Sequence, residues 1–293
     1  MAQSPAHRFG QIVGEVLEGS IGPLLQRFAK QHGLYLDMKG DRLCRRGKKC
    51  SWRDLNKNLH DLDFVRERGG SPNIVGMPVA FIETAWRRYT KHSRNKVQEI
   101  QGALEPLSET YRHLAPFKGA VLAGVFTDGA LAQLRSLGFT VLYFSYESVV
   151  GVFRKFGIDA SSEETTSDNA FKRKVTAYER LTDKQKSRLA AALVKAHSSD
   201  VKRFLESLST AVLRQVERIV ILVLHGEIHE VTTIDEAVSL IRNYAEEPAA
   251  KPIQRFEIEI RYNNGDVISG RFLNRDGAID FLRGFDPALP KSE

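Results

Sequence analysis

Three apolar runs of strand length constrain the fold of this chain more than any other feature of its sequence. They are PVAFIETA at 78–85, GAVLAGVF at 119–126 and TVLYFSY at 140–146. Continuous apolar runs of this kind are typical of strands that are covered on both faces. The segment after the second run, 127–137, and the segment from the third run to about residue 156 are predicted to be helices. This alternation of strand and helix predicts a partly parallel sheet.

The segments upstream of these runs complete the predicted core. Residues 61–67 form a predicted strand, and a Gly-Gly-Ser-Pro-Asn loop separates it from the strand at 78–85, which is the pattern of an antiparallel meander. Predicted helices at 8–31 and 86–104 flank this meander, and Gly22-Pro23 predicts a kink or a break in the first of them. The predicted fold class is α/β, a mixed β-sheet core flanked by helices.

The rest of the chain is predicted to form a separate C-terminal α+β region, residues 172–293. A polar segment at 158–171 is predicted to be a linker or mobile loop between this region and the core at 1–157. The predicted elements of the region are helices at 172–196 and 199–214, a strand at 217–227, a helix at 234–247, a hairpin that turns at Asn264-Gly265, and a helix at 275–283. The sequence indicates no internal repeat. We expect the region to serve in DNA recognition or dimerisation.

The bulk properties argue against several classes of protein. The chain has 293 residues but only two cysteines, Cys44 and Cys50, which are too few for a disulfide framework and lack the spacing of a zinc site. The sequence has no apolar run long enough to span a membrane and no secretory signal, so we expect a cytoplasmic protein without a membrane partner. It also lacks the GxxxxGK[ST] phosphate loop, which argues against ATP-driven chemistry, and the GxSxG motif.

Basic residues outnumber acidic residues, 43 to 36, and they gather in two segments. Such clusters bind polyanions through the release of counterions. The first segment, 42–53, is predicted to be a loop that either contacts DNA or is simply solvated. The second segment opens the predicted helix at 86–104. The candidate DNA contacts in the two segments are Arg45, Arg46, Lys48, Lys49, Arg87, Arg88 and Arg94.

Two carboxylates lie inside predicted apolar strands. Asp63 stands between Leu62 and Phe64, and Glu83 ends the run VAFIE. Burial of a carboxylate is unfavourable unless something compensates its charge. A divalent cation held between neighbouring strands would compensate both, and hard oxygen ligands suit Mg²⁺.

Two further possibilities accompany this metal site. Asp61 shares the predicted face of Asp63 by strand alternation, so it is a further candidate ligand. Alternatively, basic neighbours such as Arg66 or Arg87 pair with Asp63 and Glu83, and no metal is involved.

The segments LDFV around Asp63 and VAFIETA around Glu83 resemble the PD-(D/E)XK nuclease superfamily, which has the restriction-endonuclease-like fold. The order of predicted elements from residue 8 to residue 156 resembles that fold as well. The resemblance implies that Asp63 and Glu83 bind a metal ion, Mg²⁺. It also implies that the first helix supplies a third carboxylate, Glu15 or Glu18.

The sequence departs from the family pattern at Ala85, where the family has a lysine two residues after the glutamate. The resemblance implies that a residue of the following helix replaces this lysine, and Lys91 and Lys96 are the candidates. The catalytic lysine would position the attacking water and stabilise charge on the phosphate.

The resemblance therefore implies a magnesium-dependent endonuclease, in the first place a type II restriction enzyme that cuts double-stranded DNA. Such an enzyme would work as a homodimer at a two-fold symmetric site, and its gene would lie near that of a cognate DNA methyltransferase. Two alternatives stay open. One is a structure-specific repair or recombination nuclease of the same fold, and the other is a catalytically inactive DNA-binding protein, of which Ala85 would be the mark.

Overall fold

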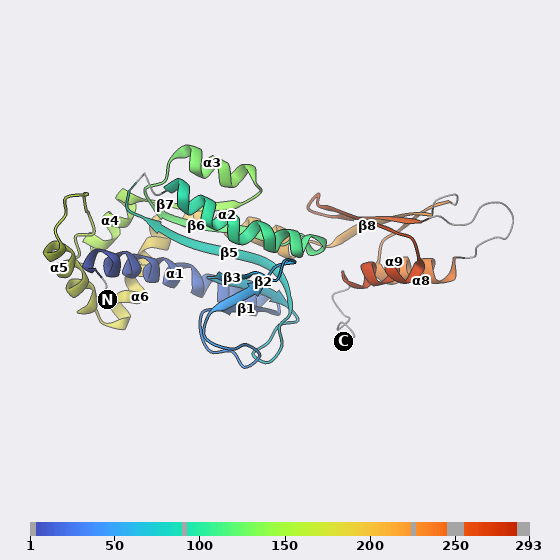
Figure 1. The fold of residues 1–293 in the computed structure, drawn as a ribbon, viewed down its shortest axis with the longest axis horizontal. Coiled ribbons are helices and arrows are strands. Elements are labelled where there is room, and N and C mark those ends of the chain that lie inside the picture. The colour runs from blue at the N-terminus through green and yellow to red at the C-terminus, as the bar shows by residue number, and fades with distance from the viewer. Residues whose placement is uncertain (1–3, 90–92, 224–226, 245–254, 286–293) are drawn as a thin grey trace. The chain divides into compact units, whose positions relative to one another are not determined.

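The computed structural model describes residues 4–89, 93–223, 227–244 and 255–285 (Figure 1). The chain divides into two compact units, the first of Met1–Tyr111 with Pro116–Leu208 and the second of Arg112–Ala115 with Ser209–Glu293. The predicted boundary at 158–171 differs from this division. Helices that follow this segment pack against the first helix of the chain, so they belong to the first unit.

A five-stranded mixed sheet forms the centre of the first unit. Its strands, in spatial order, are β1 (Leu34–Met38), β4 (Phe64–Arg68), β5 (Met77–Arg87), β6 (Phe117–Gly124) and β7 (Thr140–Ser145). The pairs β1–β4 and β4–β5 are antiparallel, whereas β5–β6 and β6–β7 are parallel. This confirms the prediction of an antiparallel meander followed by a partly parallel sheet, and with it the α/β class.

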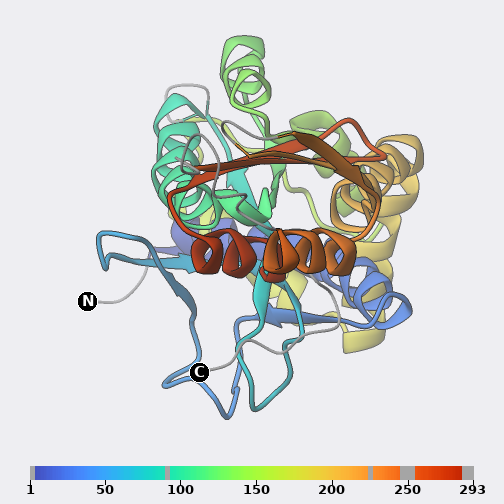
Figure 2. The same cartoon turned by 90° about the vertical axis from the view of Figure 1, so that its right-hand side faces the viewer.

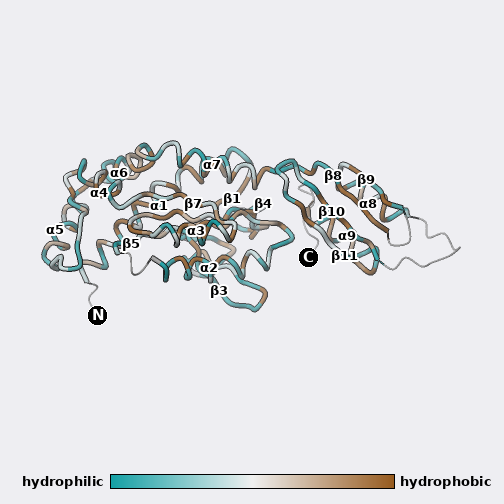
Figure 3. Tube along the Cα trace, turned by 90° about the horizontal axis from the view of Figure 1, so that it is seen from above, coloured by the Kyte–Doolittle hydropathy of each residue, from teal (hydrophilic) through white to brown (hydrophobic). Residues whose placement is uncertain are grey.

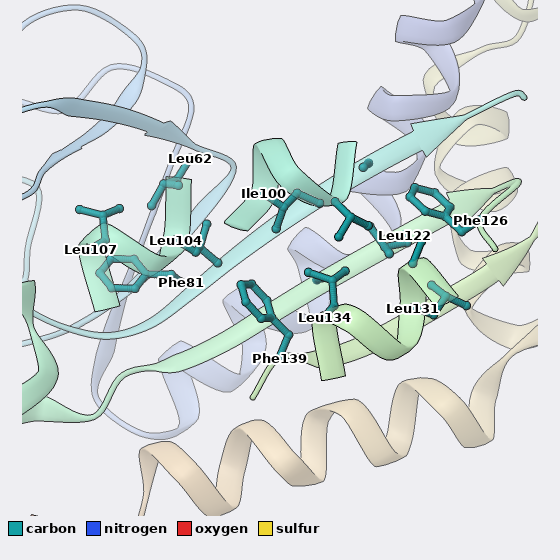
Figure 4. Packing of buried hydrophobic residues seen from close by; sticks show 14 of the residues in the cluster. Leu62, Phe81, Ile100, Leu104, Leu107, Leu122, Phe126, Leu131, Leu134 and Phe139 are labelled. Atoms are coloured by element: carbon teal, nitrogen blue, oxygen red, sulfur yellow. The ribbon is translucent and has the colours of Figure 1, made fainter. Parts of the chain in front are cut away.

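Helices cover both faces of this sheet. α2 (Ser93–Thr110) and α3 (Asp128–Ser136) lie over one face, and α1 (Pro5–Gln31) lies over the other (Figure 1). Figure 4 shows the apolar layer under α2 and α3, where Phe81 and Leu122 of the sheet meet Ile100, Leu104 and Leu134. The remaining helices of this part of the chain are α4 (Tyr146–Arg154), α5 (Asp168–Glu179), α6 (Asp183–Ala196) and α7 (Ser198–Val212).

The prediction of one strand at 61–67 is wrong, because the strand breaks at Asp63. The residues before the break form β3 (Leu59–Leu62), which pairs with β2 (Cys50–Arg53) in a separate two-stranded sheet. The residues after the break form β4 in the central sheet. The break therefore places Asp63 between two sheets rather than within one strand.

The prediction of a helix at 86–104 is also wrong at its start. β5 continues to Arg87 because it pairs with β6 over its whole C-terminal half, and α2 begins only at Ser93. The predicted break at Gly22-Pro23 does not occur, since α1 runs without interruption through Pro23. The buried apolar face of α1 extends on both sides of that proline and offsets the hydrogen bond that it removes.

A four-stranded antiparallel sheet forms the second unit, in the spatial order β11-β10-β8-β9. Its elements are β8 (Val216–Val223), β9 (Ile228–Val231), α8 (Ile234–Asn243), β10 (Phe256–Tyr262), β11 (Val267–Phe272) and α9 (Arg275–Arg283), and the short 3-10 helix η2 (Arg112–Leu114) also belongs to the unit. The helices α8 and α9 lie side by side against one face of the sheet (Figure 2). The predicted hairpin at Asn264-Gly265 and the predicted helix at 275–283 are confirmed.

The second unit contains an internal repeat of structure, contrary to the prediction of no repeat. Each half is a β-hairpin followed by a helix, with Thr233 as the N-cap of α8 and Asn274 as the N-cap of α9. The first strands of the two halves, β8 and β10, pair antiparallel at the centre of the sheet. Hydrophobic and hydrophilic residues alternate along β10 (Figure 3). Along β8 the burial alternates, although the residues from Ile219 to Val223 are all apolar.

In the predicted helical stretch 172–214 there are three helices rather than two, because a capping box of Thr182 and Gln185 starts α6. Among the described residues, no helix is long and apolar enough to cross a membrane.

Candidate functional site

The structure brings Asp63 and Glu83 together. The backbone N–H of Asp63 donates a hydrogen bond to Glu83 Oε1 over 3.1 Å. This contact follows from the register of the two strands: Phe64 pairs with Ile82, so the residue before Phe64 lies opposite the residue after Ile82. Because the strand breaks at Asp63, its N–H is available to the side chain of Glu83.

Thr84, the neighbour of Glu83 on β5, holds the carboxylate of Asp63. Both the backbone N–H and the hydroxyl of Thr84 donate to Asp63 Oδ2, each over 2.7 Å. Two donors on one oxygen fix the rotamer of Asp63 at the break between β3 and β4. Thr84 was not among the predicted site residues, although a hydroxyl residue directly after a glutamate in an apolar strand indicates a polar partner.

Glu83 is almost completely buried, with 8% of its surface exposed. Burial, together with the negative charge of Asp63, raises the pKa of Glu83 to about 8, while the charge of Lys96 acts in the opposite direction. Burial likewise raises the pKa of Glu18 to about 7, and the charge of Asp63 contributes to that rise. Carboxylates of α1, of the β3–β4 break and of β5 are thus within electrostatic reach of one another.

The two candidate carboxylates on α1 differ in their surroundings. The charge of Asp63 acts on Glu18, whereas Glu15 pairs with Arg8. Glu15 is half exposed and forms an ion pair with Arg8 at 2.7 Å. Glu18 is partly buried, and the charge of Asp63 acts on it directly.

Asp61 is not brought to Glu83. Its carboxylate binds Lys49 Nζ and Ser51 Oγ, each at 2.5 Å, across the two-stranded sheet of β2 and β3. The expectation that Asp61 and Asp63 share a strand face fails because the strand breaks between β3 and β4.

Ala85 stands where the family has a lysine, and Lys96 is the candidate replacement that lies among the described residues. It lies on the first turns of α2, is largely buried, and its Nζ contacts Glu99 Oε2 at 3.1 Å. Its positive charge lowers the pKa of Glu83, which places it within reach of the carboxylates. Lys91, the other candidate, lies outside the described residues.

The basic segment 42–53 has two roles in the structure. Arg42 and Arg45 turn inward: Arg42 binds the buried Glu67 through both terminal nitrogens, and Arg45 contacts both oxygens of the buried Asp37 at 2.7 Å. These ion pairs hold the loop to the central sheet. The exposed basic residues of the segment are Arg46, Lys48, Lys49, which is paired with Asp61, and Arg53, which donates to the carbonyl of Lys57.

The second basic segment is also divided. Arg87 contacts Glu99 at 3.4 Å, and the guanidinium of Arg88 stacks over Phe171 at 4.6 Å, while Arg94 is exposed. Arg66 pairs with neither Asp63 nor Glu83 in any contact that the structure describes. It is fully buried toward α1, where it donates to the carbonyl of Leu25 over 2.6 Å.

No group of three or more His, Cys, Asp or Glu side chains is arranged to hold a metal ion within the described part of the chain. This does not disagree with a magnesium site, because Mg²⁺ keeps several waters and usually binds one or two carboxylates together with substrate phosphates. Asp63 and Glu83 would supply two hard carboxylate ligands, and the raised pKa of Glu83 reflects a buried carboxyl whose charge a cation would compensate.

No family model and no curated protein matches this chain. Among solved structures, the crystal structure of a protein of unknown function, AF1548, is similar, with 11% sequence identity and a TM-score of 0.28. The match covers 67% of this chain and 95% of that chain. A likeness at this TM-score supports no conclusion about fold or function.

The contact between Thr84 and Asp63 makes a prediction about metal binding. We expect Thr84→Val to weaken Mg²⁺ binding by roughly tenfold, because hydrogen bonds that orient a ligand typically contribute that much to metal affinity. Thr84→Ser keeps the hydroxyl and should bind as the natural protein does. Calorimetric titration of the metal-free variants measures both affinities, and equal affinities for Val and Ser would refute the positioning role.

Proposed function

We propose that this protein is a magnesium-dependent DNA endonuclease and that its first unit has the restriction-endonuclease-like fold. The observation that carries the proposal is the convergence of Asp63 and Glu83, joined by a hydrogen bond between adjacent strands and held by Thr84. The order of the central sheet, two antiparallel pairs followed by two parallel pairs, supports the fold assignment.

The chemistry follows from these residues. Asp63 and Glu83 would bind Mg²⁺, with Glu18, whose pKa the charge of Asp63 raises, as the candidate third carboxylate. When bound, Mg²⁺ lowers the pKa of a coordinated water and neutralises charge that develops on the phosphate. The protein's own part is to hold the two carboxylates where β4 begins beside β5 and to keep Glu83 away from bulk water.

Lys96 would supply the positive charge that Ala85 does not. We expect Lys96→Met to lower the cleavage rate by about a hundredfold, the lower end of what a positioned acid–base group contributes. Lys96→Arg keeps the charge but not the geometry or the proton chemistry, and it should rescue little. A single-turnover assay at saturating Mg²⁺ separates this effect from weakened metal binding. Full activity in Lys96→Met would assign the role to another residue.

The DNA would lie along the exposed basic residues of the first unit. Arg46, Lys48 and Arg94 are exposed and are candidates for phosphate contacts, whereas Arg45 is engaged inside the loop. Cleavage of both strands of a duplex, as by a type II restriction enzyme, would need two copies of the chain. In that case a DNA methyltransferase encoded nearby would protect the host's own sites.

A plasmid assay with purified protein tests the proposal. Incubation with supercoiled plasmid in Mg²⁺ should give nicked or linear DNA, and incubation in EDTA should leave it intact. Discrete fragments would favour a restriction enzyme. A protein that shifts DNA in a gel but cuts neither plasmid nor DNA with an unpaired arm, at any Mg²⁺ or Mn²⁺ concentration, would contradict the nuclease and leave the DNA-binding alternative.

A further inference from the structure

We propose that a cleft beside the carboxylates takes an unpaired nucleotide of the substrate strand, so that the enzyme acts where DNA strands separate rather than on a continuous duplex. This inference rests on the proposed function and names its substrate class. The cleft has a volume of about 540 Å³ and lies between α1, the end of β5 and the start of α2.

The cleft adjoins the candidate metal ligands through two residues. Thr84, which hydrogen-bonds to Asp63, lines it from β5, and Lys96, whose charge acts on Glu83, lines it from α2. A nucleotide in the cleft would therefore be a neighbour of the phosphodiester at the carboxylates. This continuity makes the cleft part of the substrate path.

The charge of the lining suits a phosphate. Three cationic side chains, Arg87, Arg88 and Lys96, line the cleft, against one carboxylate, Glu99. Glu99 contacts both Arg87 and Lys96, so it is shared between two cations. An anionic ligand would complete the charge balance of this wall.

The polar groups of the lining suit a base. The side chain of Trp86 is 92% buried, and its indole N–H has no hydrogen-bond partner in the described part of the chain. The six-membered edge of the same indole faces Gly124, so the N–H lies on the edge that points away from that glycine. Gln11 and Asn95 add amide donors and acceptors on the opposite walls. The amides of Gln11 and Asn95 would read the edge of a base that has left its stack.

Two glycines leave part of the α1 wall of the cleft without side chains. Nothing lies within 4 Å of the positions that a β-carbon would take at Gly10 and Gly14, and both glycines line the cleft. The volume is that of a pocket for one small ligand, in the usual range of about 300–1,000 Å³. An intact duplex would not enter a cleft of this size, but a single unpaired nucleotide would.

Gly10→Leu tests the inference because it fills the cleft from an open position two turns away from Glu18. Gly102→Leu is the matched control: it introduces the same side chain at an open helical position, on α2, that does not line the cleft. The substrates are an intact 30-base-pair duplex and the same duplex with a splayed, unpaired arm at one end. Cleavage in Mg²⁺ and binding in EDTA, measured by fluorescence anisotropy, are compared for each protein.

We expect the natural protein and Gly102→Leu to cut and bind the splayed DNA at least tenfold better than the intact duplex. Gly10→Leu should bring that ratio close to one. Equal treatment of both substrates by the natural protein, or an unchanged ratio in Gly10→Leu, overturns the inference and leaves the nuclease proposal intact. If neither substrate is cut, the nuclease proposal fails. In that case binding in EDTA still tests whether the cleft takes an unpaired nucleotide. Equal affinity of the natural protein and Gly10→Leu for splayed DNA would contradict that role of the cleft.

Discussion

Asp63→Asn will lower DNA cleavage by roughly a thousandfold or more, the loss of about 4 kcal/mol of transition-state stabilisation at ~1.4 kcal/mol per factor of ten. Asparagine has the shape of aspartate and still accepts the two hydrogen bonds from Thr84, so the fold should persist. What it lacks is the negative charge that binds the cation. The rate is measured by single-turnover cleavage, with circular dichroism as the check on folding.

Matched variants of the other carboxylates sharpen this prediction. Glu83→Gln should lose activity to the same degree. Glu18→Gln should lose activity as well, whereas Glu15→Gln should keep it, because Glu15 is paired with Arg8 at the surface. Asp61→Asn should also remain active, since Asp61 binds Lys49 and Ser51 in another sheet. An Asp63→Asn protein that cuts DNA at the natural rate would end the assignment.

Glu83→Gln will stabilise the metal-free protein at pH 8.5 but not at pH 4.5. Burial raises the pKa of Glu83 from 4.5 to about 8, so the folded protein disfavours the charged form that the unfolded chain readily adopts. Burial of Glu83 costs no folding stability at a pH below its pKa in the unfolded chain, because the carboxyl is then neutral in both states. The cost grows as the pH rises from about 4.5 to about 8, and at ~1.4 kcal/mol per pH unit it reaches a few kcal/mol.

Urea unfolding in EDTA at the two pH values measures this effect. The free energy of unfolding of Glu83→Gln should exceed that of the natural protein at pH 8.5 and match it at pH 4.5. Added Mg²⁺ should stabilise the natural protein at pH 8.5, because it binds the folded state, and should stabilise Glu83→Gln far less. A difference of the same size at both pH values would show that the buried charge is not its cause.

The central sheet and its pair of acidic residues were accessible from the sequence. The runs at 78–85, 119–126 and 140–146 predicted β5, β6 and β7, since apolar continuity marks a strand covered on both faces. The meeting of Asp63 and Glu83 followed from antiparallel pairing of adjacent strands, and the hydrogen bond at 3.1 Å bears out that they meet. Their role in binding a metal stays a prediction.

The surroundings of Asp63 and Glu83 depend on tertiary contacts that local sequence patterns do not predict. Alternation placed Asp61 beside Asp63, but the break at Asp63 depends on β3 pairing with β2 rather than with the central sheet. Spacing on α1 left Glu15 and Glu18 equivalent until the packing of the helix exposed one and partly buried the other. Arg45 was predicted to contact DNA because it lies in a basic loop. Nothing in the local sequence indicates that Asp37, the residue that binds it, is buried.

The end of the first unit was misjudged for a similar reason. The polar composition of 158–171 predicted a linker, but the Nζ of Lys174 donates to the carbonyls of Asp159 and Ser161, which ties this segment to α5. The repeat in the second unit escaped detection because its halves share a pattern of strand, strand and capped helix rather than a string of identical residues.

A crystal of the protein soaked in Mn²⁺, with anomalous diffraction, tests the central claim most directly, since Mn²⁺ takes the same hard oxygen ligands as Mg²⁺. The account predicts an anomalous peak within direct coordination distance of Asp63 and Glu83, about 2.1 Å for a small divalent ion. The peak should disappear in Asp63→Asn. A peak elsewhere on the molecule, or a peak that Asp63→Asn leaves in place, would contradict the account.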